Sequence, residues 1–278
     1  MKIAVCFSGT LRQFKTFHTP FKNHIVDANK CDVDIFVSTW KSKIRHFKKQ
    51  VVDDGNLDEM IDLYDPTLVN VEIYDDKKRQ QLYTESRMDE FQSEAQKFHS
   101  CKKLHRKDKC RFCGSNNIHN QIGQLYNIWK ANELRKQHEK DTGIKYDLVI
   151  RTRFDNYFFD SLTDFETERT CNGSVWIPYG YDDLPEYGGG VNDQFAIGTG
   201  ESMDAYCNMY PNMYKYSMKH CKTKQGYGVP HRTIVDACEE NGIKVERFWL
   251  KYVLRKKFDL YKKRTKGITK EQYKELRI

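Results

Sequence analysis

The segment from Val149 to Asp155 carries the residue types best suited to chemistry in this sequence. It reads Val-Ile-Arg-Thr-Arg-Phe-Asp, so an apolar run typical of a buried strand ends in two arginines and a carboxylate. Strand side chains repeat every two residues, which predicts Arg151, Arg153 and, if the strand continues, Asp155 on one face. Two guanidiniums can bind a diphosphate, and a carboxylate beside them can hold a divalent cation. A structural ion pair between Asp155 and one arginine is the alternative.

A second segment places a carboxylate between two amides, directly after a glycine run. Residues 188–198 read Gly-Gly-Gly-Val-Asn-Asp-Gln-Phe-Ala-Ile-Gly. Glycines allow a backbone to approach a ligand closely or allow a loop to move. Asn192 and Asp193 also form a common turn pair. A turn explains those two residues but leaves the glycines and Gln194 unexplained.

A third segment, Ser8-Gly9-Thr10-Leu11-Arg12, follows the apolar run of Ile3–Phe7. Its place after a predicted first strand suits a nucleotide. It contains neither the glycine-rich dinucleotide fingerprint nor the Gly-Lys-Ser/Thr of a phosphate loop. Ser8, Gly9 and Arg12 are therefore candidate ligand contacts only in combination with the other segments.

The elements that must position these segments alternate between strand and helix in the first half of the chain. This alternation indicates βαβ units and a mainly parallel sheet, whose strand ends at the carboxyl side bind ligands. The predicted strands are Ile3–Phe7, Asp34–Thr39, Leu68–Tyr74, Tyr146–Thr152, Val175–Pro178, Phe195–Gly198 and Val245–Leu254, and the predicted helices are Leu57–Tyr64, Asn120–Thr142, Glu201–Tyr210 and His231–Asn241.

We predict one α/β domain over residues 1–278, with a Rossmann-like half continuous with a smaller half. Residues 1–74 and 120–160 form the predicted nucleotide-sugar half, and residues 161–254 the acceptor half. Residues 75–119 are polar and highly charged, which predicts an insertion or a flexible helical arm, and residues 255–278 form a basic tail.

The three segments together resemble a known family. Cys6-Phe-Ser-Gly-Thr-Leu-Arg12, Val149-Ile-Arg-Thr-Arg-Phe-Asp155 and Asn192-Asp-Gln-Phe-Ala-Ile-Gly198 are similar to signature blocks of small glycosyltransferases of large algal DNA viruses. Within that family the likeness is greatest to the chlorovirus enzymes, xylosyltransferases in particular, that build a capsid N-glycan. The resemblance covers roughly residues 1–250.

The resemblance implies a GT-A fold, a nucleotide-sugar donor (UDP-xylose as the best guess) and an oligosaccharide or glycoprotein acceptor containing fucose. Ser8, Gly9, Arg12, Arg151, Arg153, Asp155 and Gln194 are then the predicted donor contacts. The family's metal motif is Asp-X-Asp, whereas this chain reads Arg153-Phe154-Asp155. Asp155 is thus the predicted ligand of Mn²⁺ or Mg²⁺, with its further ligands open.

On this interpretation an acceptor hydroxyl attacks the anomeric carbon and a nucleoside diphosphate departs. An inverting reaction needs a carboxylate to take the proton, and such general-base help contributes about 10²–10⁴-fold. Asp193 is the predicted base, with Glu186 and Asp183 next, because it follows the glycine-rich loop as the catalytic acid does in inverting members of this fold.

A separate cluster in the 75–119 stretch has residue types that bind zinc. Its members are His99, Cys101, His105, Cys110, Cys113 and His119. Cys110-Arg-Phe-Cys113 has the spacing of one half of a structural zinc site. The other half would need Cys101 with His105 or His119, and a free thiol loop or a disulfide is the alternative.

Charge argues against a nucleic-acid binder, the main alternative function. The net charge is +8, and the residues from Lys244 onward carry 13 Lys/Arg and 4 Asp/Glu, so the remainder is close to neutral. A nucleic-acid binder that used the cysteine cluster and this tail would interleave basic and aromatic residues over one face. A hydrolase or phosphatase would need a second carboxylate beside Asp155. The sequence offers neither pattern.

Hydropathy predicts a protein without a transmembrane segment. No run approaches 18 apolar residues, and the first apolar run is five residues long without a cleavage-type site. We therefore expect a cytoplasmic protein, in the host cell if the chain is viral.

Overall fold

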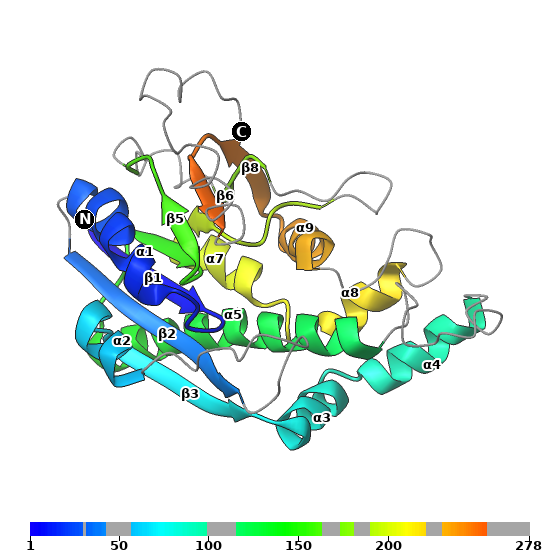
Figure 1. Cartoon of the computed structure of the whole chain (residues 1–278). Helices are drawn as coiled ribbons and strands as arrows, with labels where there is room; N and C mark the ends of the chain where they lie inside the picture. The colour runs from blue at the N-terminus through cyan, green and yellow to red at the C-terminus, as the bar shows by residue number, and fades with distance from the viewer. Residues whose placement is uncertain are drawn as a thin grey trace, which may run out of the picture.

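A seven-stranded sheet forms the centre of the protein (Figure 1). The computed structural model describes residues 1–29, 32–42, 57–98, 115–162, 173–180, 190–220 and 230–254. The sheet order is β3-β2-β1-β4-β7-β6-β8, which confirms the predicted α/β class with a mainly parallel sheet. The strands are β1 (Lys2–Ser8), β2 (Asp32–Ser42), β3 (Leu68–Tyr74), β4 (Leu148–Thr152), β6 (Ser174–Pro178), β7 (Ala196–Gly198) and β8 (Lys244–Phe248).

One strand of this sheet runs against the others. Strands β1 to β4 are mutually parallel, β7 is antiparallel to both β4 and β6, and β8 is parallel to β6. Among the described strands of the sheet, β7 alone is therefore reversed. As a result, the residues just before β7 lie at the same edge as the residues just after β1, β4, β6 and β8.

Both faces of the sheet are covered, which explains why its inner strands are apolar on both sides. In β1, Ile3, Val5 and Phe7 pack with α1 (Phe14–Phe21) and α2 (Leu57–Tyr64). Ala4 and Cys6 point the other way, toward α5 (Ser115–Thr142), with α7 (Gly200–Cys207), α8 (Met213–His220) and α9 (Pro230–Glu240) in the same cluster. Figure 1 shows α5 running alongside the sheet.

Residues 75–98, the first part of the 75–119 stretch, are helical and packed against the rest of the protein. They form α3 (Asp76–Glu85) and α4 (Met88–Phe98), and the Asp75 side chain caps α3 by accepting from the Lys78 amide at 2.8 Å. Leu82, Met88 and Phe91 are fully buried in the core cluster of α5. These helices are therefore part of the core and not a flexible arm. A few apolar residues at helical spacing are enough to pack a helix against the core, even when most of its other residues are charged.

Some element boundaries also differ from their predictions. The helix α5 begins at Ser115, five residues before the predicted cap at Asn120. The predicted last strand, 245–254, is two strands in two sheets. After β8, β9 (Tyr252–Leu254) pairs with β5 (Asn156–Phe158) in a separate antiparallel sheet. The sequence pattern did not predict β5, α1 or α8.

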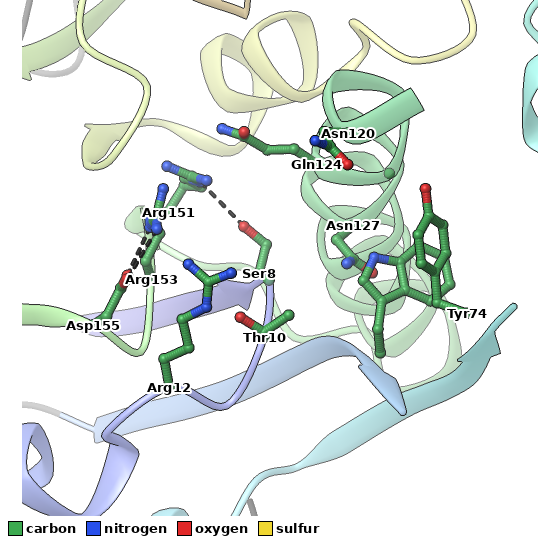
Figure 2. A pocket seen from close by; sticks show the side chains of 13 residues that line it. Ser8, Thr10, Arg12, Tyr74, Asn120, Gln124, Asn127, Arg151, Arg153 and Asp155 are labelled. Atoms are coloured by element: carbon green, nitrogen blue, oxygen red, sulfur yellow. Dashed lines mark hydrogen bonds and ion pairs between the residues drawn. The ribbon is translucent and has the colours of Figure 1, made fainter. Parts of the chain in front are cut away.

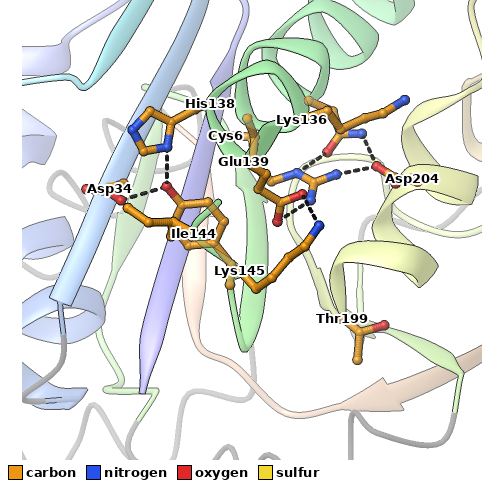
Figure 3. A network of polar contacts seen from close by, with 12 residues as sticks. Cys6, Asp34, Lys136, His138, Glu139, Ile144, Lys145, Thr199 and Asp204 are labelled. Carbon is orange, nitrogen blue, oxygen red and sulfur yellow. Dashed lines mark hydrogen bonds and ion pairs between the residues drawn. The ribbon is translucent and has the colours of Figure 1, made fainter. Parts of the chain in front are cut away.

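A buried arginine, Arg135, joins α5 to α7, and Figure 3 shows two of its acidic partners, Glu139 and Asp204. Arg135 is 1% exposed, and its guanidinium donates to Asn132 at 3.0 Å, pairs with Glu139 at 3.0 Å and contacts the Asp204 carboxylate. A buried guanidinium requires partners of this kind, because an unpaired buried charge is strongly unfavourable. The network fixes the helix that supplies one wall of the pocket described below.

The described cysteines behave as small apolar residues. Cys6, Cys207 and Cys238 are free and buried, as their apolar surroundings in the sequence indicate. None of the helices in the described ranges has the length and apolarity needed to cross a bilayer.

Candidate functional site

A pocket of about 270 Å³ lies at the carboxyl-side edge of the sheet (Figure 2). The pocket lies at the end of β1, which is flanked in the sheet by β2 on one side and by β4 on the other. Open α/β sheets bind ligands at such a switch point, where loops diverge and leave a crevice. Its lining residues are Ser8, Gly9, Thr10, Arg12, Trp40, Tyr74, Asn120, Gly123, Gln124, Asn127, Arg151, Arg153 and Asp155.

Arg151 is the residue that most clearly indicates an anionic ligand. It is 1% exposed, and its Nε donates to the Ser8 hydroxyl at 3.2 Å. Its Nη1 is buried and has no hydrogen-bond partner among the described residues. An unsatisfied buried donor on a cation is costly, so a ligand oxygen at this position would stabilise it. Figure 2 shows Arg12 and Arg153 around the same space.

Arg153 and Asp155 form a two-point ion pair, the structural alternative considered for this segment. Nε of Arg153 donates to Oδ1 of Asp155 at 2.7 Å, and Nη2 donates to Oδ2 at 2.9 Å. Burial alone would raise the pKa of the Asp155 carboxyl, but the guanidinium outweighs it and holds the pKa below its usual range. Asp155 is thus an ionised carboxylate with both oxygens occupied.

A divalent cation at Asp155 would compete with Arg153, which already pairs with both carboxylate oxygens. Asp155 is the one carboxylate in the described pocket lining, so the remaining ligands of such a cation would have to be substrate phosphates and water. No group of three His, Cys, Asp or Glu able to hold a metal lies in the part of the chain that the structure describes. Three arginines carry the positive charge of this pocket instead.

Asp193 lies just outside the pocket lining and is joined to it through Gln124. The Gln124 amide donates to Oδ2 of Asp193, while Nε2 of His231 lies 3.2 Å from Oδ1. Asp193 is 5% exposed. Burial would raise the pKa of its carboxyl, but His231 and the nearby arginines, Arg151 and Arg153, hold the pKa well below its usual range.

The loop before β7 is built to hold Asp193 in place. Asn192 is fully buried. Its Nδ2 donates to the Pro178 carbonyl at 3.1 Å, and its Oδ1 accepts from the backbone N–H of Gln194 at 2.8 Å. An added Cβ on Gly190 would lie 2.7 Å from the backbone carbon of His231. The last glycine of the run therefore permits the close approach that brings His231 to Asp193.

Most of the predicted donor contacts lie together in the pocket lining, and one of them lies outside it. Ser8, Gly9 and Arg12 lie in the pocket lining with Arg151, Arg153 and Asp155. Gln194 does not; it is 6% exposed, and its carbonyl accepts from Asn156 at 3.0 Å.

The predicted zinc site falls largely outside the described residues. Cys110 and Cys113 lie in the undescribed range 99–114, as do His99, Cys101 and His105. His119 is described: it is 8% exposed and its ring centroid is 4.6 Å from that of Tyr83.

Several residues of the site were not predicted from the sequence as contacts. Tyr74 is the last residue of β3 and Trp40 lies close to the end of β2, so their positions near carboxyl strand ends were a usable signal. Gln124 and Asn127 project from α5, and Asn127 Nδ2 is a buried donor with no hydrogen-bond partner among the described residues. Neither they nor His231 have a motif that would single them out.

Comparison with known proteins assigns this chain to no family. No protein-family model matches the sequence, and no curated protein matches it. Among solved structures, the apo form of mouse xyloside xylosyltransferase 1 is similar, with a TM-score of 0.40, 8% sequence identity, and coverage of 89% of this chain and 84% of that chain. A likeness of this size carries no conclusion about what this chain does.

Proposed function

We propose that this protein is a glycosyltransferase that binds a nucleotide sugar in the pocket at the β1/β4 switch point. The observation that carries the proposal is the buried Arg151, which lines the pocket together with two more arginines and whose Nη1 has no hydrogen-bond partner among the described residues. Three guanidiniums against one carboxylate suit the negative charge of a diphosphate.

The opposite end of the same pocket suits a nucleobase. Trp40 and Tyr74 have ring centroids 4.9 Å apart, and both line the pocket near the carboxyl ends of β2 and β3. Adjacent strands are about 4.8 Å apart, so β2 lies roughly 10 Å from β4 along this edge. That separation matches a nucleoside whose base contacts the aromatic end while its phosphates reach the arginine end.

In the proposed reaction, an acceptor hydroxyl oxygen forms a bond to the anomeric carbon of the donor sugar. The bond from that carbon to the phosphate oxygen breaks, and its electron pair leaves with the nucleoside diphosphate. The hydroxyl proton goes to the Asp193 carboxylate. Arg151 and Arg153 stabilise the charge that develops on the leaving group.

The resemblance of the three sequence segments supplies the substrates to test first. UDP-xylose is the proposed donor, and a fucose-containing oligosaccharide, such as a viral capsid N-glycan, is the proposed acceptor. Inversion of the anomeric configuration follows if Asp193 acts as a base and not as a nucleophile.

Calorimetric titration of UDP tests the donor site. Arg151→Gln removes the cation, and we expect UDP affinity to fall at least tenfold. Arg12→Gln, at a less buried position, should also lower the affinity for UDP. Arg87→Gln is the matched control, because Arg87 lies in the turn between α3 and α4, pairs with Glu90 and is not among the residues lining the pocket. Unchanged UDP binding in both pocket variants, with wild-type thermal melting, would refute the proposal.

A further inference from the structure

An exposed pair of aromatic residues stands at the ends of β6 and β8. Trp249 is 85% exposed and Tyr179 is 46% exposed. Their ring centroids are 4.8 Å apart and the ring planes are inclined by 36°. We call this pair the aromatic platform. Large apolar rings that stay exposed side by side commonly mark a binding surface.

The aromatic platform is held in place by its surroundings. The Tyr179 amide donates to the Phe248 carbonyl at 3.0 Å, so the two strand ends continue their pairing beyond the sheet. Arg247 donates from Nη2 to the Pro178 carbonyl at 2.7 Å, and its guanidinium carbon lies 5.2 Å from the centroid of the Tyr179 ring. A cation over a ring restrains both groups.

The aromatic platform is continuous with the proposed catalytic carboxylate. The Pro178 carbonyl that accepts from Arg247 also accepts from Asn192, the residue before Asp193. In the sheet order, β6 is two strands from β4 and β8 is three, which is roughly 10 to 15 Å at the usual strand spacing. A short oligosaccharide spans that distance.

We infer that Tyr179 and Trp249 form an acceptor subsite that stacks on the apolar face of a sugar ring in an oligosaccharide. This inference rests on the proposed glycosyltransferase function and names where its acceptor binds. A sugar ring has C–H bonds on its face and hydroxyls at its rim. An aromatic ring packs against the C–H bonds of the sugar face and leaves the hydroxyls at the rim free to reach Asp193.

A membrane surface is the competing partner for an exposed tryptophan near basic residues. The other large apolar side chains that are exposed in the described ranges lie on α2 and β3 or at the N-terminus: Met1, Ile61, Leu63, Val71 and Ile73. β3 is at the opposite end of the sheet from β8. Among the described residues, no other large exposed apolar side chain lies on the strands that carry Trp249 and Tyr179, which favours a sugar.

The test uses the full chain and an array of defined N-linked and fucosylated oligosaccharides. We expect Trp249→Ala and Tyr179→Ala to reduce glycan retention at least about tenfold, while Trp249→Phe, which keeps an aromatic face, retains most of it. Ile73→Ala is the control for removing an exposed apolar side chain. UDP affinity, measured on the same samples, should not change in any variant.

The outcomes separate this inference from the proposed function. Equal glycan retention by Trp249→Ala and wild type, or no glycan retained by wild type, would overturn the subsite. Binding to phosphatidylserine vesicles that is lost in Trp249→Ala, without glycan retention, would assign the platform to a membrane instead. Glycan retention that depends on Trp249 in a protein that fails to bind UDP would keep the subsite and reject the donor site.

Discussion

Nε2 of His231 lies 3.2 Å from Oδ1 of Asp193, which joins the start of α9 to the loop before β7. With Gln124 on the other oxygen, the carboxylate has a fixed orientation. Its lowered pKa keeps it ionised throughout the neutral range. A carboxylate is therefore always available to accept a proton, although a low pKa weakens the driving force for the transfer.

Asp193→Asn should lower the rate of sugar transfer by about 10²-fold and change UDP affinity little. The amide keeps the size and turn preference of the side chain but cannot accept the proton. Steady-state kinetics and UDP titration measure the two effects separately. Asp32→Asn, at an exposed position at the amino end of β2, is the control and should match wild type.

His231 is expected to act as a positioning residue for Asp193. His231→Gln can still donate to the carboxylate and should keep more activity than His231→Ala. Equal losses in the two variants would contradict a positioning role.

A fall in UDP affinity in step with the transfer rate of Asp193→Asn would instead make Asp193 a contact of the donor.

Asp155→Asn distinguishes the arginine site from a metal site. The substitution releases Arg153 and removes the one carboxylate of the described pocket lining, so UDP should bind as tightly as to wild type or several-fold more tightly. Titrations in EDTA and in Mn²⁺ should agree for both proteins. If UDP binding needs Mn²⁺ and disappears in Asp155→Asn, the carboxylate is a metal ligand.

Arg135→Met should destabilise the fold by roughly 2–4 kcal/mol, because it leaves Asp204 and Glu139 without their buried partner. Denaturant unfolding measures the change. Arg87→Met breaks an exposed ion pair, which solvent screens, and should therefore change stability much less than Arg135→Met. UDP affinity of the folded Arg135→Met protein should stay near wild type, since Arg135 is not among the residues lining the pocket.

His119 should make stability fall as the pH is lowered from neutral to 5. Burial lowers the pKa of its imidazole from 6.5 to about 4. Between these values the unfolded chain binds a proton that the folded chain does not, so folding loses about 1–2 kcal/mol by pH 5. His119→Phe should show a smaller loss over the same range in denaturant unfolding. An identical loss would mean that other groups cause it.

The arginine end of the pocket could be predicted from the sequence, whereas its connection to Asp193 could not. Ser8 and Arg151 each follow a short, uninterrupted apolar run, and such runs are recognisable as buried strands. The direction of β7 could not be predicted, because a strand of three residues has no pattern that gives its orientation. The contact with His231 depends on tertiary packing near Gly190, which sequence spacing does not encode.

Residues 75–98 show a further limit of sequence patterns. Charge dominates their composition, so their burial was missed, although Leu82, Met88 and Phe91 are fully buried. Hydrophobic spacing within such a stretch is more informative than its mean polarity. The bidentate pair of Arg153 and Asp155 was foreseen only as an alternative, since a segment alone does not decide between an internal partner and a ligand.

The position of β7 between β4 and β6 also limits the order in which the sheet can assemble during synthesis. Strands β1 to β4 are complete once residue 152 has emerged from the ribosome, and they can pair at once. β6 emerges next, but both of its partners in the sheet, β7 and β8, are made later. Within the described residues, β6 must wait as an unpaired strand until residues 196–198 join it to β4. Translation speed across this interval should therefore influence the yield of folded protein.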